Sequence, residues 1–307
     1  MTFEVTGEDI EESWRRIAVH VRRTPVLDLG RGLGDFDLVL KLEHLQVTGS
    51  FKARGAFSIM TGVDMPEAGV VAASGGNFGA AVAHAAHVLG RPATIFVPET
   101  SPPAKIDRIR RHGADVRVIP GFYDQAREAS ERHAAETGAY QAHAYDQPEV
   151  VAGQGTIAME IAGQAEPDVV LVAVGGGGLI AGVASWFGDD VSVVAVEPER
   201  CSCLNAALAA GHPVDVEVSG VAVSSLGARR VGDHCWAARK RIDRSVLVDD
   251  EAIVDAQRWL WSETRLVVEP AAATSLAALR TRAIQPDPGA RVVAVLSGAN
   301  LDPATVG

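Results

Sequence analysis

The feature that most constrains the fold of this chain is a repeated alternation between two kinds of segment. Short apolar runs rich in β-branched residues end in glycine, asparagine or proline, and stretches with the composition of helices follow them. The clearest runs are residues 69–74, 93–98, 115–120, 168–174, 191–199 and 291–296. Strands that alternate with helices indicate βαβ units, and strands apolar on both faces indicate a parallel sheet covered on each side. The sequence therefore predicts an α/β fold.

Length, charge and cysteine content exclude several classes of protein. The 307 residues, 47% of them hydrophobic, can bury a large core, and at about 150 residues per domain they predict two lobes. A formal charge of -11 has the wrong sign for a protein that neutralises the phosphates of a nucleic acid, so we expect no nucleic-acid partner. No apolar run reaches the roughly 18 residues of a membrane span, and the N-terminus lacks a signal-peptide pattern, so a cytoplasmic protein without a membrane partner is expected. Three cysteines without CxxC spacing predict no disulfide framework.

Four consecutive glycines stand between a buried strand and a helix in the segment Val172–Gly182. Consecutive glycines let several backbone N–H groups point at one spot at the start of the following helix, which suits a phosphate. A tight strand-to-helix turn without a ligand explains the pattern equally well. The GxGxxG pattern of nicotinamide-binding folds matches at Gly175 and Gly177, but Ile180 stands where its third glycine belongs. Glu197 does stand about where the acidic residue of that pattern is expected. A nicotinamide-dependent oxidoreductase is therefore a weaker alternative.

Two further loops follow apolar strands. SGGNFG, residues 74–79, offers a hydroxyl, an amide and free N–H groups at the start of a helix, and so predicts a second anion site of the size of a carboxylate. Alternatively, Ser74 or Asn77 caps that helix and binds nothing. LSGAN, residues 296–300, places the hydroxyl of Ser297 at the end of the last strand, where it can bond a ring nitrogen or only form a turn.

Lys52 stands in GSFKARGAF, where a charged amine finds little water. Desolvation lowers the pKa of a lysine and makes a nucleophilic neutral amine available. Together with a phosphate cradle and a carboxylate cradle, such a lysine suggests pyridoxal 5'-phosphate, whose aldehyde condenses with an amine, and Phe51 offers an apolar neighbour for the ring. Alternatively, Lys52 is a surface lysine that opens a helix, and Arg54 beside it indicates nearby water.

Eight motifs occur in an order and spacing that resemble one known family. They are KLEHLQVTGSFKARGAF, SGGNFGAA, VAGQGTIAMEI, VGGGGLIAG, AVEPE, SGVAV, VEPAAA and VLSGAN, and the likeness runs from about Arg23 to Leu301. On these motifs the chain resembles the serine/threonine dehydratase family of fold-type II pyridoxal-phosphate enzymes, to which serine racemase is related. Eight motifs in one order are far more specific than any one of them.

The resemblance implies a role for each matching residue. Lys52 matches the lysine that forms the Schiff base, and Phe51 the residue that packs on the ring. Five positions match the loop that binds the cofactor phosphate: Gly175, Gly176, Gly177, Gly178 and Leu179. Four match the ring and its edge: Asn77 at the ring hydroxyl, Ser297 at the pyridine nitrogen, and Gly220 and Glu269 along the cofactor edge. Five match the loop that binds the substrate carboxylate: Ser74, Gly75, Gly76, Asn77 and Phe78.

The resemblance also implies an architecture, which is a two-lobed, tryptophan synthase β-like fold with mostly parallel sheets covered by helices. Residues 1–55 and 146–307 would form a large cofactor-binding domain, and residues 56–145 a small mobile domain. Family members are commonly dimers, so a homodimer is expected. The chain ends soon after LSGAN, which leaves no room for an appended regulatory domain of about 100 residues, so feedback control through one is not expected.

The implied activity is that of a pyridoxal-phosphate-dependent dehydratase, or ammonia-lyase. It would convert a small L-β-hydroxy amino acid, serine or threonine first and a 3-hydroxyaspartate or bulkier analogue second, to a 2-oxo acid and ammonia. A β-replacement enzyme or an amino-acid racemase on the same fold is an alternative. A non-catalytic protein that binds the cofactor is another.

Three positions depart from the family pattern. Gly75 stands where racemases carry a second serine on the face opposite the lysine, which favours elimination over racemisation. Phe78 replaces a histidine found in many members. Glu197 matches one acidic ligand of a divalent cation, and Cys201 could lend its carbonyl, but Cys203 replaces the second acid. Because a thiolate suits Mg²⁺ or Ca²⁺ poorly, Glu197 is only a weak candidate and we expect no metal site.

Overall fold

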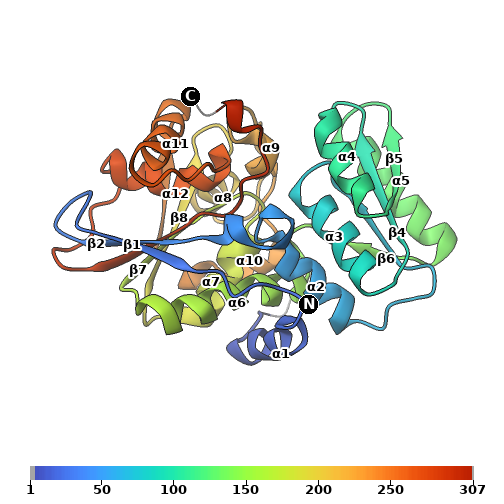
Figure 1. Ribbon diagram of the computed structural model, residues 1–307, viewed down its shortest axis with the longest axis horizontal. Helices are drawn as coiled ribbons and strands as arrows, with labels where there is room; N and C mark the ends of the chain where they lie inside the picture. The colour runs from blue at the N-terminus through green and yellow to red at the C-terminus, as the bar shows by residue number, and fades with distance from the viewer. Residues whose placement is uncertain (1–3, 306–307) are drawn as a thin grey trace.

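The computed structural model describes residues 4–305 and contains two β-sheets (Figure 1). The larger sheet has the strand order β1 (Val26–Gly30), β2 (Asp37–Lys41), β10 (Arg291–Val295), β7 (Val169–Ala173), β8 (Ser192–Pro198) and β9 (Arg244–Val248). The smaller sheet has the order β5 (Asp115–Ile119), β4 (Ala93–Pro98), β3 (Val70–Ala73) and β6 (Tyr140–Ala142). Neighbouring strands are parallel except for β1 and β2. The predicted α/β fold with mostly parallel sheets is confirmed.

Helices cover both faces of the larger sheet. One face forms a core with α1 (Gly7–Ile17), α6 (Pro148–Ala165), α7 (Gly178–Phe187), α8 (Cys203–Ala210) and α10 (Asp233–Ala238). The other face forms a core with α9 (Val223–Leu226), α11 (Asp250–Thr264) and α12 (Pro270–Arg280). Strand β7 contributes to both, because Val170 and Val172 join the first core while Leu171 and Ala173 join the second. This is why its sequence is apolar without alternation.

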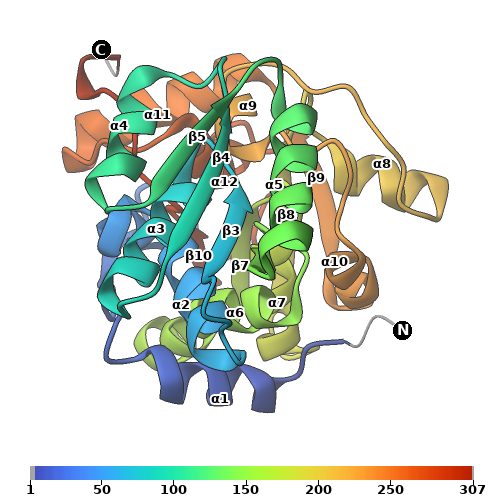
Figure 2. The same cartoon turned by 90° about the vertical axis from the view of Figure 1, so that its right-hand side faces the viewer.

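The smaller sheet is covered in the same way (Figure 2). Helices α2 (Lys52–Gly62), α3 (Asn77–Val88) and α4 (Pro103–Arg111) form a core on one face, and α5 (Tyr123–Thr137) packs on the other. The 3-10 helices are η1 (Glu43–Leu45), η2 (Val47–Gly49), η3 (Arg239–Arg241) and η4 (Pro303–Thr305). All four strands of this sheet lie within residues 56–145, the predicted small domain; that this part moves as a unit stays a prediction. Within residues 4–305, no helix is both long and apolar enough to cross a membrane.

A buried network of ion pairs connects α2, which begins with Lys52, to α6, β2 and η1. Its members are Lys41, Glu43, Arg54 and Glu160, and all four side chains are almost fully buried. The guanidinium of Arg54 donates to both oxygens of Glu43 at 2.9 and 2.7 Å and to Glu160 at 2.8 Å, and the amine of Lys41 donates to Glu160 at 2.6 Å. The interpretation of Arg54 as a sign of nearby water is therefore wrong.

Charge balance explains why this network is tolerated in the core. Burial alone would raise the pKa of Glu43, but the guanidinium of Arg54 outweighs that effect and lowers it, so the carboxyl stays ionised. Two positive and two negative groups then compensate one another at short distance. Because the partners come from β2, η1, α2 and α6, the network fixes the start of α2, where Lys52 lies, relative to the larger sheet.

Replacing Arg54 with methionine leaves Glu43 and one oxygen of Glu160 buried without a cation. We expect the free energy of unfolding to fall by about 3–5 kcal/mol, as for other broken buried ion pairs. Arg15→Met is the matched control, because Arg15 forms an exposed pair with Glu11 one helical turn away, and its loss costs about 0.5 kcal/mol or less. Urea denaturation of both variants measures the difference. Equal effects would contradict a role for the network in stability.

Candidate active site

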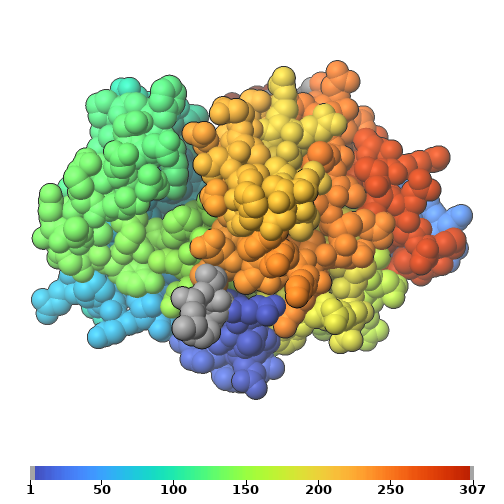
Figure 3. Space-filling model, turned by 180° about the vertical axis from the view of Figure 1, so that it is seen from behind, coloured from blue at the N-terminus to red at the C-terminus, as the bar shows by residue number. Residues whose placement is uncertain are grey.

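The loop that follows β3 contacts the loop that follows β10, because Asn300 donates to Asn77. The loop that follows β7 packs on α9 at Leu226, and α9 contacts the same region through Ser225. Ligands of α/β proteins bind at the carboxyl ends of the strands, where these loops lie. The segment before α2 joins them, because the N–H of Phe51 donates to the carbonyl of Ser297 at 3.0 Å and Ser50 forms a bridge with Gly298. Seen from behind, the yellow and orange segment that follows β8 abuts the green segment that includes α5 (Figure 3).

Lys52 is the first residue of α2, and its amine points into this region. The Nζ atom donates to the carbonyl of Ala144 at 2.8 Å and lies 5.0 Å from the ring centre of Phe51 and 5.8 Å from that of Phe78. Burial lowers the pKa of the amine from its ordinary 10.5 to about 8. The side chain is half-buried, so the amine is desolvated yet reachable. At pH 7 about a tenth of the amine is therefore neutral and nucleophilic, far more than for an ordinary lysine.

The glycine loop Gly175–Gly178 forms an N–H cradle. Gly177 adopts a left-handed conformation with φ of 93° and caps α7 without any side-chain bond. In the part of the chain that the structure describes, no protein acceptor receives the N–H groups of residues 175–179. The ring of Tyr145 lies so close to Gly176 that an added Cβ would be 2.3 Å from it. Free N–H groups at the start of a helix suit a phosphate, so these residues fit the phosphate of pyridoxal phosphate.

Ser297 lies directly after β10 and is buried, with 8% of its surface exposed. Its carbonyl accepts from the N–H of Phe51, while its hydroxyl has no hydrogen-bond partner within residues 4–305. The hydroxyl oxygen is not sealed from solvent, so it is free to donate to or accept from a ligand that enters the site. The geometry therefore fits a hydroxyl that bonds a ring nitrogen, and it brings Ser297 to the same place as Phe51 and Lys52.

The loop SGGNFG, residues 74–79, opens α3, and neither of its polar residues caps the helix. The N-cap position is Gly76, which has no side-chain cap, and the N–H of Gly76 donates to the hydroxyl of Ser74 at 3.4 Å. The simple capping interpretation of Ser74 or Asn77 is therefore wrong. Gly75 faces the loop after β4, where the hydroxyl of Ser101 lies 2.1 Å from the place that a Cβ would take. A side chain at Gly75 would have to displace Ser101.

Glu269 links four segments of the site. Its carboxylate accepts from the Asn77 amide at 3.0 Å to each oxygen, from the Ser225 hydroxyl at 2.7 Å and from the Asn300 N–H at 2.6 Å. The amide of Asn300 also donates to the side-chain oxygen of Asn77 at 2.8 Å. Asn77 and Glu269, which were predicted for different parts of the cofactor, are thus in direct contact. The sequence analysis missed Ser225 and Asn300, although each lies within or beside a motif that it used: Asn300 ends LSGAN, and Ser225 follows SGVAV by two residues.

Tyr145 and Ala144 were also missed, because they follow β6, a strand of three residues that no apolar run marks. The Tyr145 hydroxyl lies 3.4 Å from the carbonyl of Arg230 on the other side of the cleft. Gly220 lies shortly before α9, where its carbonyl accepts from the N–H of Val223 at 3.3 Å. Its nearest neighbour is the carboxylate of Asp250 at the start of α11, 2.6 Å from an added Cβ. A role for Gly220 at the cofactor edge stays a prediction.

Glu197, the weak metal candidate, is already bonded within the protein. Its oxygens accept from the N–H groups of Leu204 and Asn205, both at 2.8 Å, and from the hydroxyl of Ser245 at 2.9 Å. Burial raises the pKa of Glu197 to about 7, against the lowering effect of these bonds. The thiol of Cys203 donates to the carbonyl of Gly175 at 3.2 Å. Glu197 and Cys203 therefore act here as links between α8, β8 and the glycine loop.

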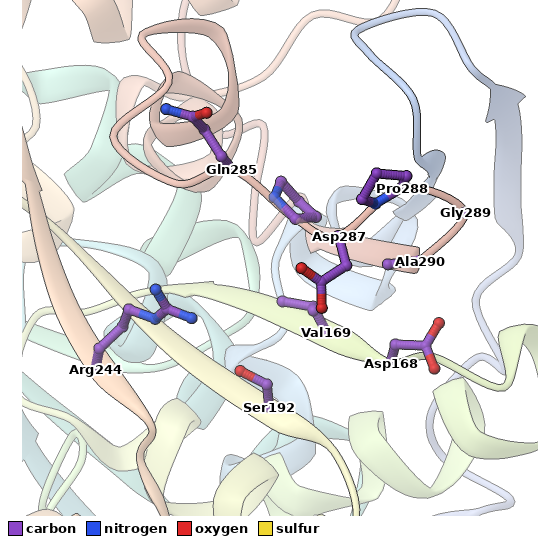
Figure 4. A pocket seen from close by; sticks show the side chains of 10 residues that line it. Asp168, Val169, Ser192, Arg244, Gln285, Asp287, Pro288, Gly289 and Ala290 are labelled. Atoms are coloured by element: carbon purple, nitrogen blue, oxygen red, sulfur yellow. The ribbon is translucent and has the colours of Figure 1, made fainter.

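A hollow with a volume of about 480 Å³ lies at the opposite edge of the larger sheet (Figure 4). Val169, Ser192 and Arg244 line it at the amino ends of β7, β8 and β9, together with residues 285–290. Ligands of parallel sheets bind at the carboxyl ends. This hollow is therefore separate from the loops that carry Lys52 and the glycine cradle.

A desolvated lysine amine, free N–H groups at the start of a helix and a serine hydroxyl without a protein partner are the groups that a site for pyridoxal phosphate requires. The family model described as pyridoxal-phosphate dependent enzyme matches residues 17–298. The chain belongs to this family, and its cofactor is pyridoxal 5'-phosphate.

Two relatives and one solved structure are similar to this chain over nearly its whole length. The chain is 37% identical to the L-threonine ammonia-lyase of Thermotoga maritima over 97% of this chain and 76% of that protein. It is 36% identical to the biosynthetic L-threonine dehydratase of Mycobacterium tuberculosis over 99% of this chain and 74% of that one. The structure of maize serine racemase matches with a TM-score of 0.94 at 31% identity and covers 99% of this chain and 96% of that one.

Gly176→Ala tests the N–H cradle. The new Cβ would overlap the Tyr145 ring, so the loop must shift. We expect the dissociation constant for pyridoxal phosphate to rise about tenfold or more, which is a loss of at least ~1.4 kcal/mol of binding free energy. Gly163→Ala in α6 is the control, because nothing lies within 4 Å of its added Cβ and alanine favours a helix by about 0.5–1 kcal/mol. Fluorescence titration of the cofactor-free protein measures both. Unchanged affinity in Gly176→Ala would contradict the cradle.

The pKa of Lys52 predicts a pH dependence. Because the pKa is about 8 in the folded protein and 10.5 ordinarily, folding releases a proton from Lys52 between these values, and this group contributes more to stability as the pH rises through that range. Labelling of the cofactor-free protein by an amine-selective reagent, read at Lys52 by peptide mass spectrometry, should rise from pH 7 and level off near pH 9. Labelling that rises steadily through pH 10 would contradict the lowered pKa.

Proposed function

We propose that this protein is a pyridoxal-phosphate-dependent dehydratase, or ammonia-lyase, that converts a small L-β-hydroxy amino acid to a 2-oxo acid and ammonia, with L-threonine or L-serine as the first candidates. The observation that carries the proposal is how Lys52 is connected to the N–H cradle at residues 175–179 and to Ser297. Its amine donates to the carbonyl of Ala144, next to Tyr145, which packs against the glycine loop, and the N–H of the preceding Phe51 donates to the carbonyl of Ser297. The names of the L-threonine ammonia-lyase and dehydratases that the chain resembles support it.

Each group of the chain has a distinct task in this proposal. Bound pyridoxal phosphate supplies the electron-withdrawing group that makes the α-proton of the amino acid acidic. The N–H groups at residues 175–179 hold the phosphate, and those of residues 74–78 at the start of α3 hold the substrate carboxylate. The free amine of Lys52 would remove the α-proton of the bound substrate, and its pKa of about 8 suits a general base near neutral pH.

Ser297 favours elimination over transamination. A hydroxyl is a weaker proton donor than an acid, and it cannot hold a pyridine nitrogen protonated as a carboxylate would. A cofactor held by such a hydroxyl would withdraw electrons less strongly through its ring, which would favour loss of the β-hydroxyl over transamination. A neutral ring nitrogen next to Ser297 is thus consistent with a dehydratase.

The alternatives differ in what they require. A racemase needs an acid or base on the face opposite Lys52, and Gly75 has no side chain there, with the Ser101 hydroxyl against it. A β-replacement enzyme needs a second nucleophile as substrate. Membership of the pyridoxal-phosphate family removes the nicotinamide-dependent oxidoreductase from consideration.

We further propose that residues 56–145 close over the substrate as a small mobile domain, and that the protein works in the cytoplasm as a homodimer.

The test is the release of 2-oxo acid and ammonia from L-threonine and L-serine by the purified protein. We expect equal amounts of both products, and a loss of about 10²–10⁴-fold or more in kcat when Lys52 is replaced by alanine, because the general base is lost. Lys240→Ala, at an exposed lysine in η3, should keep full activity. Product that forms only when a thiol or amine is supplied would favour β-replacement, and inversion without ammonia would favour a racemase.

A further inference from the structure

We propose that Asn300 and Ser225 are positioning residues that, through Glu269, hold the side-chain amide of Asn77 in one orientation, with one N–H left free for the ring hydroxyl of the cofactor. The inference rests on the proposed function in one respect, which is that pyridoxal phosphate is the ligand that Asn77 meets. It goes further by assigning a task to two residues outside the predicted site.

An asparagine amide can be turned in two ways, and its neighbours decide between them. The amide nitrogen of Asn300 donates to the side-chain oxygen of Asn77 at 2.8 Å and to the carbonyl of Thr48 at 2.8 Å. Both oxygens of Glu269 accept from the amide nitrogen of Asn77 at 3.0 Å. A donor on one side of the Asn77 amide and an acceptor on the other permit only one orientation.

Glu269 is fixed as an acceptor by its own surroundings. Its side chain is buried, with 6% exposed, and no lysine or arginine forms a salt bridge with it within residues 4–305. The N–H of Asn300 and the hydroxyl of Ser225 donate to it at 2.6 and 2.7 Å. Hydrogen bonds to a charged group are stronger than those between neutral groups, so these donors support the buried carboxylate, together with the electrostatic attraction of the Arg108 guanidinium. Ser225 therefore acts on Asn77 through Glu269.

The donors of Asn77 leave one N–H group free. Its amide nitrogen carries two hydrogens, and one of them, directed between the two oxygens of Glu269, accounts for both 3.0 Å contacts. No other acceptor receives the second hydrogen in the part of the chain that the structure describes. An N–H group beside the first turn of α3 with no protein acceptor is available to a ligand, in line with the predicted contact to a ring hydroxyl.

The same network connects the two sheets. Asn77 begins α3 on the smaller sheet, whereas Ser225 lies in α9, Glu269 precedes α12 and Asn300 follows β10 on the larger sheet. The carbonyl of Ser224 also lies 3.8 Å from the added Cβ of Gly76. The amide of Asn77 is therefore held in place only while the loops of the two sheets are together, which couples its orientation to their approach.

Asn300→Asp is the decisive variant. The carboxylate keeps the shape of the side chain but cannot donate to Asn77, and it adds a negative charge beside Glu269. The amide of Asn77 then lies between two carboxylates and loses its single orientation. We expect the dissociation constant for pyridoxal phosphate, measured by fluorescence titration of the cofactor-free protein, to rise about tenfold, or ~1.4 kcal/mol, and the visible absorbance of the bound cofactor to shift.

Asn205→Asp is the matched control, because Asn205 donates to Ser245, which donates to the buried Glu197, outside this network. It also places a new carboxylate near a buried glutamate, so both variants should lose thermal stability, but only Asn300→Asp should lose cofactor affinity. If Asn300→Asp does not fold, Ser225→Ala serves instead. It removes one donor to Glu269 without adding charge, and we expect a rise of a few-fold in the same constant.

The outcomes separate this inference from the proposed function. Cofactor affinity and absorbance within twofold of the wild type in Asn300→Asp and Ser225→Ala, with weaker binding in Asn77→Ala, would overturn the positioning role and leave the lyase proposal intact. Equal losses of affinity in Asn300→Asp and Asn205→Asp would also overturn it, because a general loss of stability would explain them. A wild-type protein that binds no pyridoxal phosphate would overturn both.

Discussion

The buried ion network of Lys41, Glu43, Arg54 and Glu160 is the constraint on which the rest of the site depends. Four charges removed from water are tolerable only if each keeps its partner at hydrogen-bonding distance, and the distances of 2.6 to 2.9 Å between them meet that condition. Because the partners belong to β2, η1, α2 and α6, these elements cannot shift independently. Lys52 lies two residues before Arg54, on the same first turn of α2. The network therefore determines where a desolvated amine is held, and through it where the chemistry occurs.

From this fixed amine the remaining groups follow by the geometry of parallel strands. Loops at the carboxyl ends of β3, β7 and β10 bring a carboxylate-sized site, a phosphate cradle and a serine hydroxyl to one place, and Ser297 is tied to the lysine segment through the N–H of Phe51. The two anion sites that we propose would use backbone N–H groups at the starts of α3 and α7, which need no charged side chain. In our account the chain binds an anionic cofactor and an anionic substrate with neutral groups, and uses the amine of Lys52 for proton transfer.

Much of the fold was predictable from the sequence, and the failures have physical causes. The strands β3, β4, β7, β8 and β10 coincide with the predicted apolar runs, because burial on both faces leaves a local pattern. The partly exposed edge strand β5 was predicted from its β-branched residues. The antiparallel edge strand β1 and the three-residue β6 leave no such pattern, so Tyr145 behind Gly176 was missed. Arg54 was misinterpreted because its partners lie 11 and 106 residues away. Asn300 and Ser225 act on Asn77 only after the two sheets come together, and no local signal reports such a contact.

The central claim is that Lys52 is the residue that binds pyridoxal phosphate covalently, and reduction with borohydride tests it most directly. The purified protein is reduced, digested and mapped by mass spectrometry, with Lys52→Ala treated in parallel. We predict a single pyridoxyl modification on the peptide that contains GSFKARGAF, at Lys52, and none on the variant. A modification on another lysine, or none on the wild-type protein loaded with cofactor, would contradict the account.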